Sequence, residues 1–391
     1  MTTELKNNEN LSLSLLTVLA VIAGVSVANL YYNQPLLNLI RTDLGANEFQ
    51  ANLIPMLTQI GYAAGLLFII PLGDLYRRKQ IILINFTILV FALLSIGLAG
   101  HLYIVLIASL FTGLCSVMPH IFIPLAAQYS APAYKGRNVG FILSGLLTGI
   151  LASRVVSGFV GEYWGWRIMY FIAAGLMVVS AGIIVYLLPD IRPTFRGSYG
   201  SLMKSLFALV HRYSLLRLSS LRSALAFGSF LAVWACLTFK VSQAPFYAGS
   251  HAVGLLGLCG IAGALTASTV GRYVPRIGLR RFHYIGCFLM LAAWLCLWLG
   301  GRSYVGLIAG IILADIGMQG IQLSNQASIF DLCPEASNRL NTIFMTTYFI
   351  GGSLGTFLAG SCWQLFAWPG VVAVGMGLAA ASLLCNICSR E

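Results

Sequence analysis

Three ionisable side chains lie inside long apolar stretches of this sequence: Arg154, Lys240 and Asp315. A charged group at the centre of a bilayer costs on the order of 2.5–3.5 kcal/mol on insertion scales, so such residues are functional candidates by default. Asp315 is the only acid deep in an apolar stretch, and we expect it to be the group that binds and releases a proton. The alternatives are a structural ion pair between Asp315 and Arg154, and a Lys240 that reaches the membrane surface.

Polar side chains continue beyond Asp315 at helical spacing. Gln319, Gln322, Asn325 and Gln326 follow at intervals that keep them along one helix face. A polar stripe on a membrane helix must face other protein or a water-filled cavity. We therefore expect this stripe, with Gln319 and Gln322 in particular, to line a cavity.

The first apolar stretch ends in ANLYYNQPLL, from Ala28 to Leu37. Asn29, Tyr32 and Asn33 share one face of a continuous helix, so we expect them to line the same cavity and to offer hydrogen bonds and an aromatic surface. The alternative is that they bond to neighbouring helices. His120 and Trp234 are weaker members of this expected cavity set.

The apolar stretches are long enough to cross a membrane. Of 391 residues, 59% are hydrophobic and only 9% are charged, and the mean hydropathy is +0.87, whereas a soluble domain is about 25% charged. Because the apolar runs are continuous, without alternation of period two, we expect an all-α membrane protein. The twelve expected transmembrane helices are 13–38, 50–72, 80–99, 103–128, 139–161, 167–188, 222–247, 254–271, 283–300, 304–328, 341–361 and 370–388.

The basic residues are distributed unevenly along the chain. The formal net charge is +12, from 23 Lys and Arg against 11 Asp and Glu. With a cytoplasmic N-terminus, three lie outside (Arg41, Arg167, Arg302), two lie in spans, and the other eighteen face the cytoplasm. This is the positive-inside pattern. It places both termini in the cytoplasm and explains the charge without a nucleic-acid partner. The first run has no small-residue cleavage site, and the compact loops favour a bacterial inner membrane.

The chain contains an internal repeat. A polar stretch, 189–221, is expected to be a cytoplasmic linker between two halves, 1–188 and 222–391, with six spans each. Four pairs match at a constant offset of 202: Pro132 and Pro334, Arg137 and Arg339, Gly149 and Gly351, Trp166 and Trp368. Because each half has an even number of spans, both run in the same direction. The sequence therefore predicts two pseudo-symmetric six-helix bundles.

The loop after the second span reads IPLGDLYRRK, from Ile70 to Lys79, and GRYVPRIGLRR follows the eighth span at 271–281. These loops, with the repeat, resemble the major facilitator superfamily over essentially the whole chain. The resemblance implies that Asp74, Arg78 and Lys79 form a cytoplasmic latch between the halves, since a carboxylate beside an Arg can hold and release a helix end. The alternative is an ordinary basic loop.

Within that superfamily the chain is most similar to the drug:proton antiporter-like exporters. Their helix-4 Arg is replaced by Ser109, and their helix-5 signature survives only as Gly145 and Gly149. Gly351 and Gly355 occupy the equivalent place in helix 11. The GxxxG spacing permits close helix contact, and we expect these glycines to form the moving interface between the halves. The resemblance implies that helices 1, 4, 7 and 10 line the cavity and helices 2, 5, 8 and 11 form that interface.

The sequence carries none of the HExxH, GxSxG or Walker motifs that would indicate an enzyme or a primary pump. The His residues are scattered and CxxC occurs once, so we expect no metal and no cofactor. Proton-coupled export of a small organic solute by alternating access is the favoured function. Import is the alternative, with a transport-inactive sensor or membrane enzyme as the alternative class. A sugar, an amino-acid-like compound or an aromatic metabolite is the expected solute, with lipophilic drugs second, and a monomer suffices.

Overall fold

The computed structural model describes residues 11–189, 197–266, 278–330, 332–333 and 336–388, and all regular structure within them is helical. Long apolar segments fold in this way because lipid offers no partner to backbone N–H and C=O groups, and a helix satisfies them internally. Ten helices are long and apolar enough to span a membrane. One of these is two spans joined at a kink, and the shorter apolar helix Ser250–Thr266 brings the number of membrane-crossing segments to twelve.

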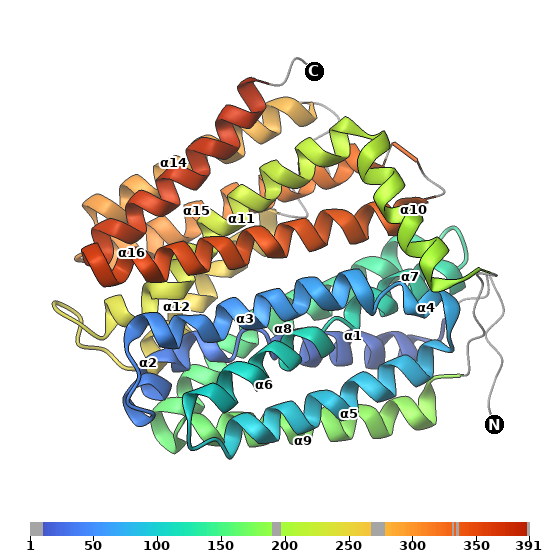
Figure 1. The fold of residues 1–391 in the computed structure, drawn as a ribbon, viewed down its shortest axis with the longest axis horizontal. Coiled ribbons are helices and arrows are strands. Elements are labelled where there is room, and N and C mark those ends of the chain that lie inside the picture. The colour runs from blue at the N-terminus through green and yellow to red at the C-terminus, as the bar shows by residue number, and fades with distance from the viewer. Residues whose placement is uncertain (1–10, 190–196, 267–277, 331, 334–335, 389–391) are drawn as a thin grey trace.

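The helices are arranged in two bundles that lie one above the other (Figure 1). The first half holds α1 (Leu13–Ala28), α2 (Asn33–Asp43), α3 (Glu48–Phe68), α4 (Leu72–Leu75), α5 (Arg78–Gly97), α6 (Leu102–Cys115), α7 (Pro119–Tyr129), α8 (Lys135–Trp164) and α9 (Trp166–Leu187). The second half holds α11 (Ser214–Val241), α12 (Ser250–Leu256), the 3₁₀ turn η1 (Gly257–Gly260), α14 (Leu279–Leu299), α15 (Tyr304–Phe330) and α16 (Ser337–Ile387).

The molecule has two ends, which we name by the elements found there. The linker end carries α4 and the helix α10 (Tyr199–Arg212), on the right of Figure 1, and the far end carries α2 and α12, on the left. The expected linker 189–221 is therefore partly helical, and α11 already begins at Ser214. Residues 267–277 and Pro334, which include much of the second loop copy and the end of the expected span 254–271, lie outside the described residues.

Three of the long helical segments are interrupted. The first is broken by a turn at Asn29–Tyr32, between α1 and α2. Pro35 explains the position of this break, because its ring would clash with the carbonyl of Tyr31 in a continuous helix. A second break separates α6 from α7, which begins at Pro119. The third is the far-end kink of α16, where Ala367 has φ 51° and ψ −142°.

The paired glycines of α8 and α16 pack inside their own halves. A Cβ at Gly149 would overlap the backbone of Gly24 in α1, and a Cβ at Gly355 would overlap Gly228 in α11. Gly145 and Gly351 contact Ala20 and Ala224 of the same two helices. The equivalence of the two glycine pairs is confirmed, but the expectation that they lie between the halves is wrong. The GxxxG spacing indicates close approach of two helices without saying which helix is the partner.

Other close contacts join the two halves. Gly158 in α8 lies against Gly254 in α12, and Gly360 in α16 lies against Asn52 in α3. Both contacts are in the far-end part of the molecule, and their positions differ by the offset of 202 that relates the halves. The second, fifth, eighth and eleventh spans, which are α3, α8, the helix Ser250–Thr266 and the first part of α16, therefore do meet between the halves, as the resemblance implied. They meet through other residues than the expected glycines.

Candidate proton and substrate site

Arg154 is buried in α8 with aromatic rings against its guanidinium group. Its side chain is 3% exposed. The guanidinium carbon lies 4.1 Å from the ring centroid of Trp234 in α11 and 4.9 Å from that of Tyr31. Arg154 Nε donates a hydrogen bond of 2.7 Å to Gln34 Oε1. Such a desolvated cation–π contact contributes about 2 kcal/mol or more, so the rings and Gln34 hold the cation in place.

Asp315 lies in the middle of α15, and both Asp315 and Arg154 pack against the glycine-rich stretch 257–263. It is 9% exposed, and its Oδ2 atom is buried without a hydrogen bond. A Cβ at Gly263 would lie 3.1 Å from Asp315 Cβ, and one at Gly257 would lie 2.8 Å from Arg154 Cβ. The glycines of this segment therefore allow the Arg154 and Asp315 side chains to pack closely against one stretch of backbone.

Arg154 and Asp315 are electrostatic neighbours but not an ion pair. Each feels the charge of the other, yet no nitrogen–oxygen contact within 4.0 Å joins these two described residues. The alternative of a structural ion pair is therefore not what the structure contains. The terminal nitrogens of Arg154 make no hydrogen bond within the described part of the chain. Arg154 and Asp315 thus leave a buried cation and a buried carboxyl close together with unused hydrogen-bonding capacity.

The polar stripe of α15 divides between the cavity side and the neighbouring helix. Gln319 lies against the same glycine as Asp315, with its Cγ 3.3 Å from a Cβ built on Gly263. Gln322 Oε1 accepts a hydrogen bond of 3.0 Å from the Tyr348 hydroxyl. Asn325 instead contacts His283 of α14, with 2.8 Å between Asn325 Nδ2 and His283 Nδ1. Gln319 therefore lies with Asp315, whereas Gln322 is bonded to Tyr348 of α16 and Asn325 to His283.

Within ANLYYNQPLL, Tyr31 and Gln34 reach Arg154, whereas the residues expected at the site do not contact it. Asn29 Nδ2 donates to the carbonyls of Val25 and Ser26 and reaches Met177 of α9, as in the alternative of bonding to neighbouring helices, while its Oδ1 is buried without a partner. The break at Asn29–Tyr32 rotates the following residues relative to a continuous helix. Tyr31 and Gln34 reach Arg154 as a result. Tyr32 and Asn33 are also buried, but no described contact joins either of them to Arg154 or Asp315.

Lys240 lies apart from the other two intramembrane charges. Its Nζ atom is 6.0 Å from the Phe246 ring centroid and 5.9 Å from that of Trp368. Arg302 is the charged group that acts on it. These residues are at the far end, where α11 finishes and α16 kinks. Lys240 therefore fits the alternative of a cation at the membrane surface and is not a partner of Arg154 or Asp315.

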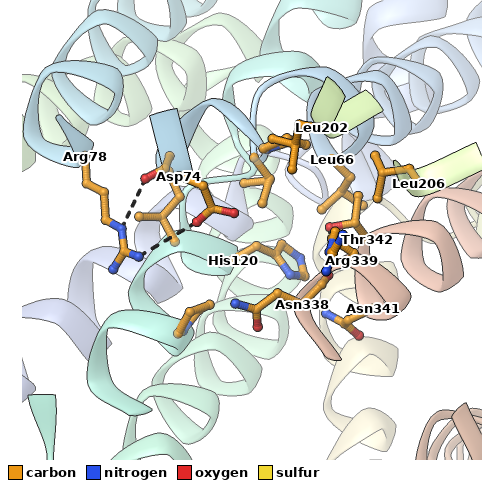
Figure 2. Close-up of a pocket in the computed structure, with 15 residues that line it drawn as sticks. Leu66, Asp74, Arg78, His120, Leu202, Leu206, Asn338, Arg339, Asn341 and Thr342 are labelled. Atoms are coloured by element: carbon orange, nitrogen blue, oxygen red, sulfur yellow. Dashed lines mark hydrogen bonds and ion pairs between the residues drawn. The ribbon is translucent and has the colours of Figure 1, made fainter. Parts of the chain in front are cut away.

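A small pocket at the linker end is lined by both halves and by α10. It includes Asp74, His120 and Arg339, with Leu202 and Leu206 of α10 along one side (Figure 2). Its volume is about 60 Å³, which holds a few waters at about 10–15 Å³ each but not an organic solute.

His120 connects this pocket to the other half. Its Nε2 atom lies 3.0 Å from the Tyr62 hydroxyl, and the Tyr62 ring lies 4.4 Å from that of Phe349 in α16, measured between centroids. His120 therefore lines the linker-end pocket, where it binds a tyrosine that contacts the second half.

The expected latch residues hold the linker end mainly within the first half. Arg78 donates to the Gly73 carbonyl and to Gln128 Oε1, and its Nη2 atom lies 4.0 Å from Asp74 Oδ1 (Figure 2). Lys79 donates to the carbonyl of Val185. The connection to the second half is electrostatic, through the charge of Arg339 on Asp74.

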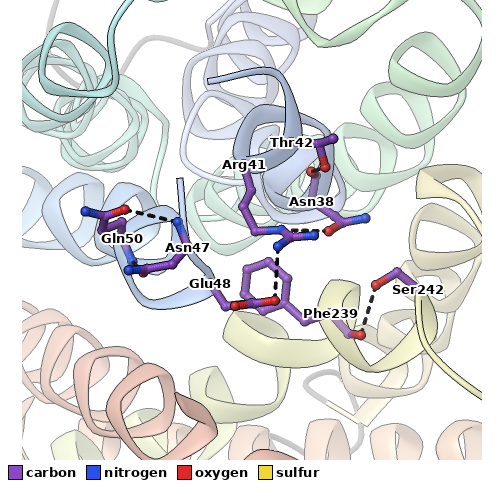
Figure 3. Close-up of polar contacts among 8 residues, drawn as sticks. All are labelled: Asn38, Arg41, Thr42, Asn47, Glu48, Gln50, Phe239 and Ser242. Atoms are coloured by element: carbon purple, nitrogen blue, oxygen red, sulfur yellow. Dashed lines mark hydrogen bonds and ion pairs between the residues drawn. The ribbon is translucent and has the colours of Figure 1, made fainter. Parts of the chain in front are cut away.

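Polar contacts close the far end between the halves. Ser250 Oγ donates to the Gly158 carbonyl at 2.8 Å, Thr238 Oγ1 donates to the Pro35 carbonyl at 3.4 Å, and Asn52 Nδ2 donates to the Thr356 carbonyl at 3.3 Å. The loop between α2 and α3 is itself fixed here by an ion pair of 3.1 Å between Arg41 and Glu48 (Figure 3). The structure is therefore closed at the far end.

Sequence reasoning missed Tyr31, Gln34 and the role of the glycines in the eighth span, which begins with α12. Gly254, Gly257, Gly260 and Gly263 recur at every third residue, which is a visible signal of one smooth helix face. Three-residue periodicity matches the 3₁₀ turn that the structure has at Gly257–Gly260.

Comparison with known proteins agrees with this architecture. The Major Facilitator Superfamily profile matches residues 19–355. The "Uncharacterized transporter YgaY" of Escherichia coli O157:H7 is 35% identical over 379 residues, covering 97% of this chain and 96% of that protein. The "Probable transporter SCO4007" of Streptomyces coelicolor is 31% identical over 360 residues, covering 92% and 84%.

Solved structures show the same fold at low sequence identity. Nucleoside transporter NupG, in a mutant form, superposes with a TM-score of 0.79 at 14% identity, covering 96% of this chain and all of that one. An inward-facing bacterial homologue of the human lysosomal transporter Spinster gives 0.69 at 14% identity, covering 96% and 94%. With two bundles of six membrane-crossing segments and relatives named as transporters, the chain belongs to the Major Facilitator Superfamily and is a multi-pass membrane transporter.

Proposed function

We propose that this transporter exports a small organic solute in exchange for protons, and that Asp315 carries the proton. The observation that supports this most is the state of its carboxyl group, which is buried, has an unpartnered Oδ2 and lies near Arg154 without pairing with it. Burial favours a neutral carboxyl, whereas a nearby cation favours a carboxylate. A movement that alters the separation of Arg154 and Asp315 would change the balance and thereby bind or release a proton.

The linker end faces the cytoplasm in this proposal. The positive-inside pattern places most Lys and Arg, the latch loop and both termini on that side. The closed far end then faces outward. A bacterial inner membrane is supported by relatives such as the "Inner membrane transport protein YnfM" of Escherichia coli, which is 23% identical over 349 residues. We further propose that a monomer suffices, because the two halves of one chain already enclose the site.

A polar, hydrogen-bonding solute fits the amide side chains of α15, of which Gln319 lies next to Asp315 and Gln322 lies farther along the helix. Two relatives are consistent with this class. A "Probable sugar efflux transporter" of Mannheimia succiniciproducens is 21% identical over 309 residues, and NupG is named as a nucleoside transporter. The first of these names also favours export. Lipophilic drugs remain the second class of solute.

Proton-coupled import is the second candidate, and the same two residues favour it for one kind of solute. An anion bound to Arg154 would be held more strongly when Asp315 is protonated, because the competing negative charge is then removed. Solute and proton would in that case bind together and move in the same direction.

Proton movement in everted membrane vesicles tests the proposal. A pH-sensitive dye reports the gradient while a panel of solutes is added to vesicles with the parent protein, Asp315→Asn or Lys240→Met. We expect a solute to collapse the gradient with the parent and with Lys240→Met, but not with Asp315→Asn. Equal responses of the parent and Asp315→Asn would reject Asp315 as the proton carrier. If no solute of the panel collapses the gradient, export by exchange is rejected.

A further inference from the structure

We propose that the exported solute is a zwitterion of the amino-acid type, whose carboxylate binds Arg154 and whose ammonium group binds Asp315. The inference rests on the proposed transport site and names its solute class. It starts from two buried atoms that lack hydrogen-bond partners, Oδ2 of Asp315 and Nε1 of Trp234, and from the buried Arg154, whose hydrogen bond to Gln34 uses only its Nε. Native proteins leave few such groups unsatisfied, so several together point to a ligand.

Arg154 has the geometry of a carboxylate site. Its Nε–H is used by Gln34, and the rings of Tyr31 and Trp234 lie against the guanidinium group. The N–H groups left over are those of the two terminal nitrogens, and a guanidinium presents them as a planar fork that suits a carboxylate. A buried cation without an anion in contact is also strongly disfavoured. A solute carboxylate would supply that missing contact.

Asp315 offers the opposite charge at the neighbouring position. Its Oδ2 atom accepts no hydrogen bond, and an ammonium group is a compact donor that would satisfy it. Gly260 and Gly263 lie beside the carboxyl, with Oδ1 3.8 Å and 3.2 Å from a Cβ built on each. A side chain at Gly263 would crowd the carboxyl, because 3.2 Å is tighter than ordinary contact, whereas 3.8 Å at Gly260 is not.

The relative placement of Arg154 and Asp315 selects a zwitterion. They interact electrostatically but form no ion pair, so each can still take a ligand group. In an amino acid the carboxylate and the ammonium sit on the same carbon, and both can be bound only where a cation and an anion are neighbours without touching.

This solute class also agrees with exchange. An ammonium group and a proton compete for the same carboxylate, because a protonated Asp315 has no negative charge to offer. Competition of solute and proton for one group gives antiport, whereas a solute with a carboxylate alone would bind together with the proton. The zwitterion therefore fits the proposed export.

Ligand-dependent thermal stabilisation of the purified full-length protein tests the class of solute. Each of the twenty amino acids, a sugar and a nucleoside is added at the same millimolar concentration, since a ligand that binds the folded state raises the unfolding temperature. For every amino acid that stabilises the protein, the decarboxylated amine and the deaminated acid of the same side chain are compared with it. We expect each loss of a charged group to weaken binding at least about 30-fold, equivalent to about 2 kcal/mol.

Charge-removing variants test which solute group binds which residue: the carboxylate to Arg154 and the ammonium group to Asp315. With Arg154→Gln, the amino acid should bind no better than its amine, and with Asp315→Asn no better than its deaminated acid. Lys240→Met removes an intramembrane cation away from the site and should retain the parent pattern. The analogue comparison uses the parent protein, so it remains decisive even where a variant fails to fold.

The inference is overturned if no amino acid stabilises the protein, or if an amine, an acid, a sugar or a nucleoside binds as tightly as any zwitterion. Its failure is separable from failure of the proposed function, because binding is measured without a proton gradient. Zwitterion binding with no proton exchange in vesicles rejects export by exchange and keeps the solute class. Proton exchange driven by a sugar, without amino-acid binding, rejects the solute class and keeps export by exchange.

Discussion

Adding one methyl group at Gly158 should open the far end of the transporter without unfolding it. A Cβ built on Gly158 lies 2.7 Å from the Ser250 carbonyl oxygen and 3.0 Å from Gly254 Cα. The first distance is 0.7 Å shorter than the 3.4 Å at which ordinary contact begins. Both partners are backbone atoms of the other half, so relief requires the halves to separate at this end.

The magnitude follows from the cost of overpacking. An extra methyl group in a well-packed site costs about 1–3 kcal/mol. Because the clash exists only when the far end is closed, this cost falls on the closed state alone. The ratio of open to closed molecules should therefore rise about 5- to 150-fold in Gly158→Ala.

Labelling of a cysteine at Thr238 measures the open population. Thr238 is 3% exposed and donates to the Pro35 carbonyl across the closed far end. In a background with the nine native cysteines replaced, Thr238→Cys should react with a membrane-impermeant maleimide about 5- to 150-fold faster when Gly158→Ala is present. Gly140→Ala is the matched control, since the same helix has open space there.

Gly149→Ala provides the contrast, because its Cβ would overlap Gly24 of the same half. It should lower the unfolding temperature without faster labelling. If Gly158→Ala instead labels like the parent and is destabilised as much as Gly149→Ala, then Gly158 is a packing residue and not part of the closure between the halves.

Two further substitutions distinguish a residue that supports Arg154 from a packing residue, and a third tests what holds α10. Gln34→Ala removes a hydrogen bond to the Arg154 cation. Because bonds to charged groups contribute about 1.5–3 kcal/mol, solute transport should fall about tenfold or more. Asn29→Ala, which frees no site residue, should lower the unfolding temperature and retain transport. Equal transport by the two variants would contradict this assignment. Tyr199→Phe removes the bond of α10 to the Phe68 carbonyl, and trypsin should then cut at Lys204 sooner than in the parent. Unchanged cleavage would show that this bond does not fix α10.

The number and order of the spans follow from the sequence, because hydropathy and length alone decide where a helix can cross lipid. The intramembrane charges are equally visible, since each is expensive and therefore rare. What hydropathy leaves undetermined is the rotation of a helix about its axis. Asn29 was placed in the cavity by assuming a continuous helix, and the turn before Pro35 brings Tyr31 and Gln34 to Arg154 instead.

Contacts between distant segments were the other quantity that the sequence could not supply. The spacing of Gly145 and Gly149 indicates a close helix contact, but α1 rather than the opposite half is the partner. Arg154 and Lys240 look alike as cations late in their spans. Only the structure shows that Arg154 lies near enough to Asp315 for their charges to interact, while Lys240 lies with Phe246 and Trp368.

Counterflow in proteoliposomes tests the proton-carrying role of Asp315 most directly. Liposomes loaded with an unlabelled solute that the parent transports are given a trace of the same labelled solute, with and without a proton gradient. Exchange of solute for solute needs no proton to be released by Asp315, whereas accumulation against a gradient does. At solute concentrations raised to offset its weaker binding, we predict that Asp315→Asn retains counterflow and loses gradient-driven accumulation. Gradient-driven accumulation at the parent level in Asp315→Asn would contradict the account.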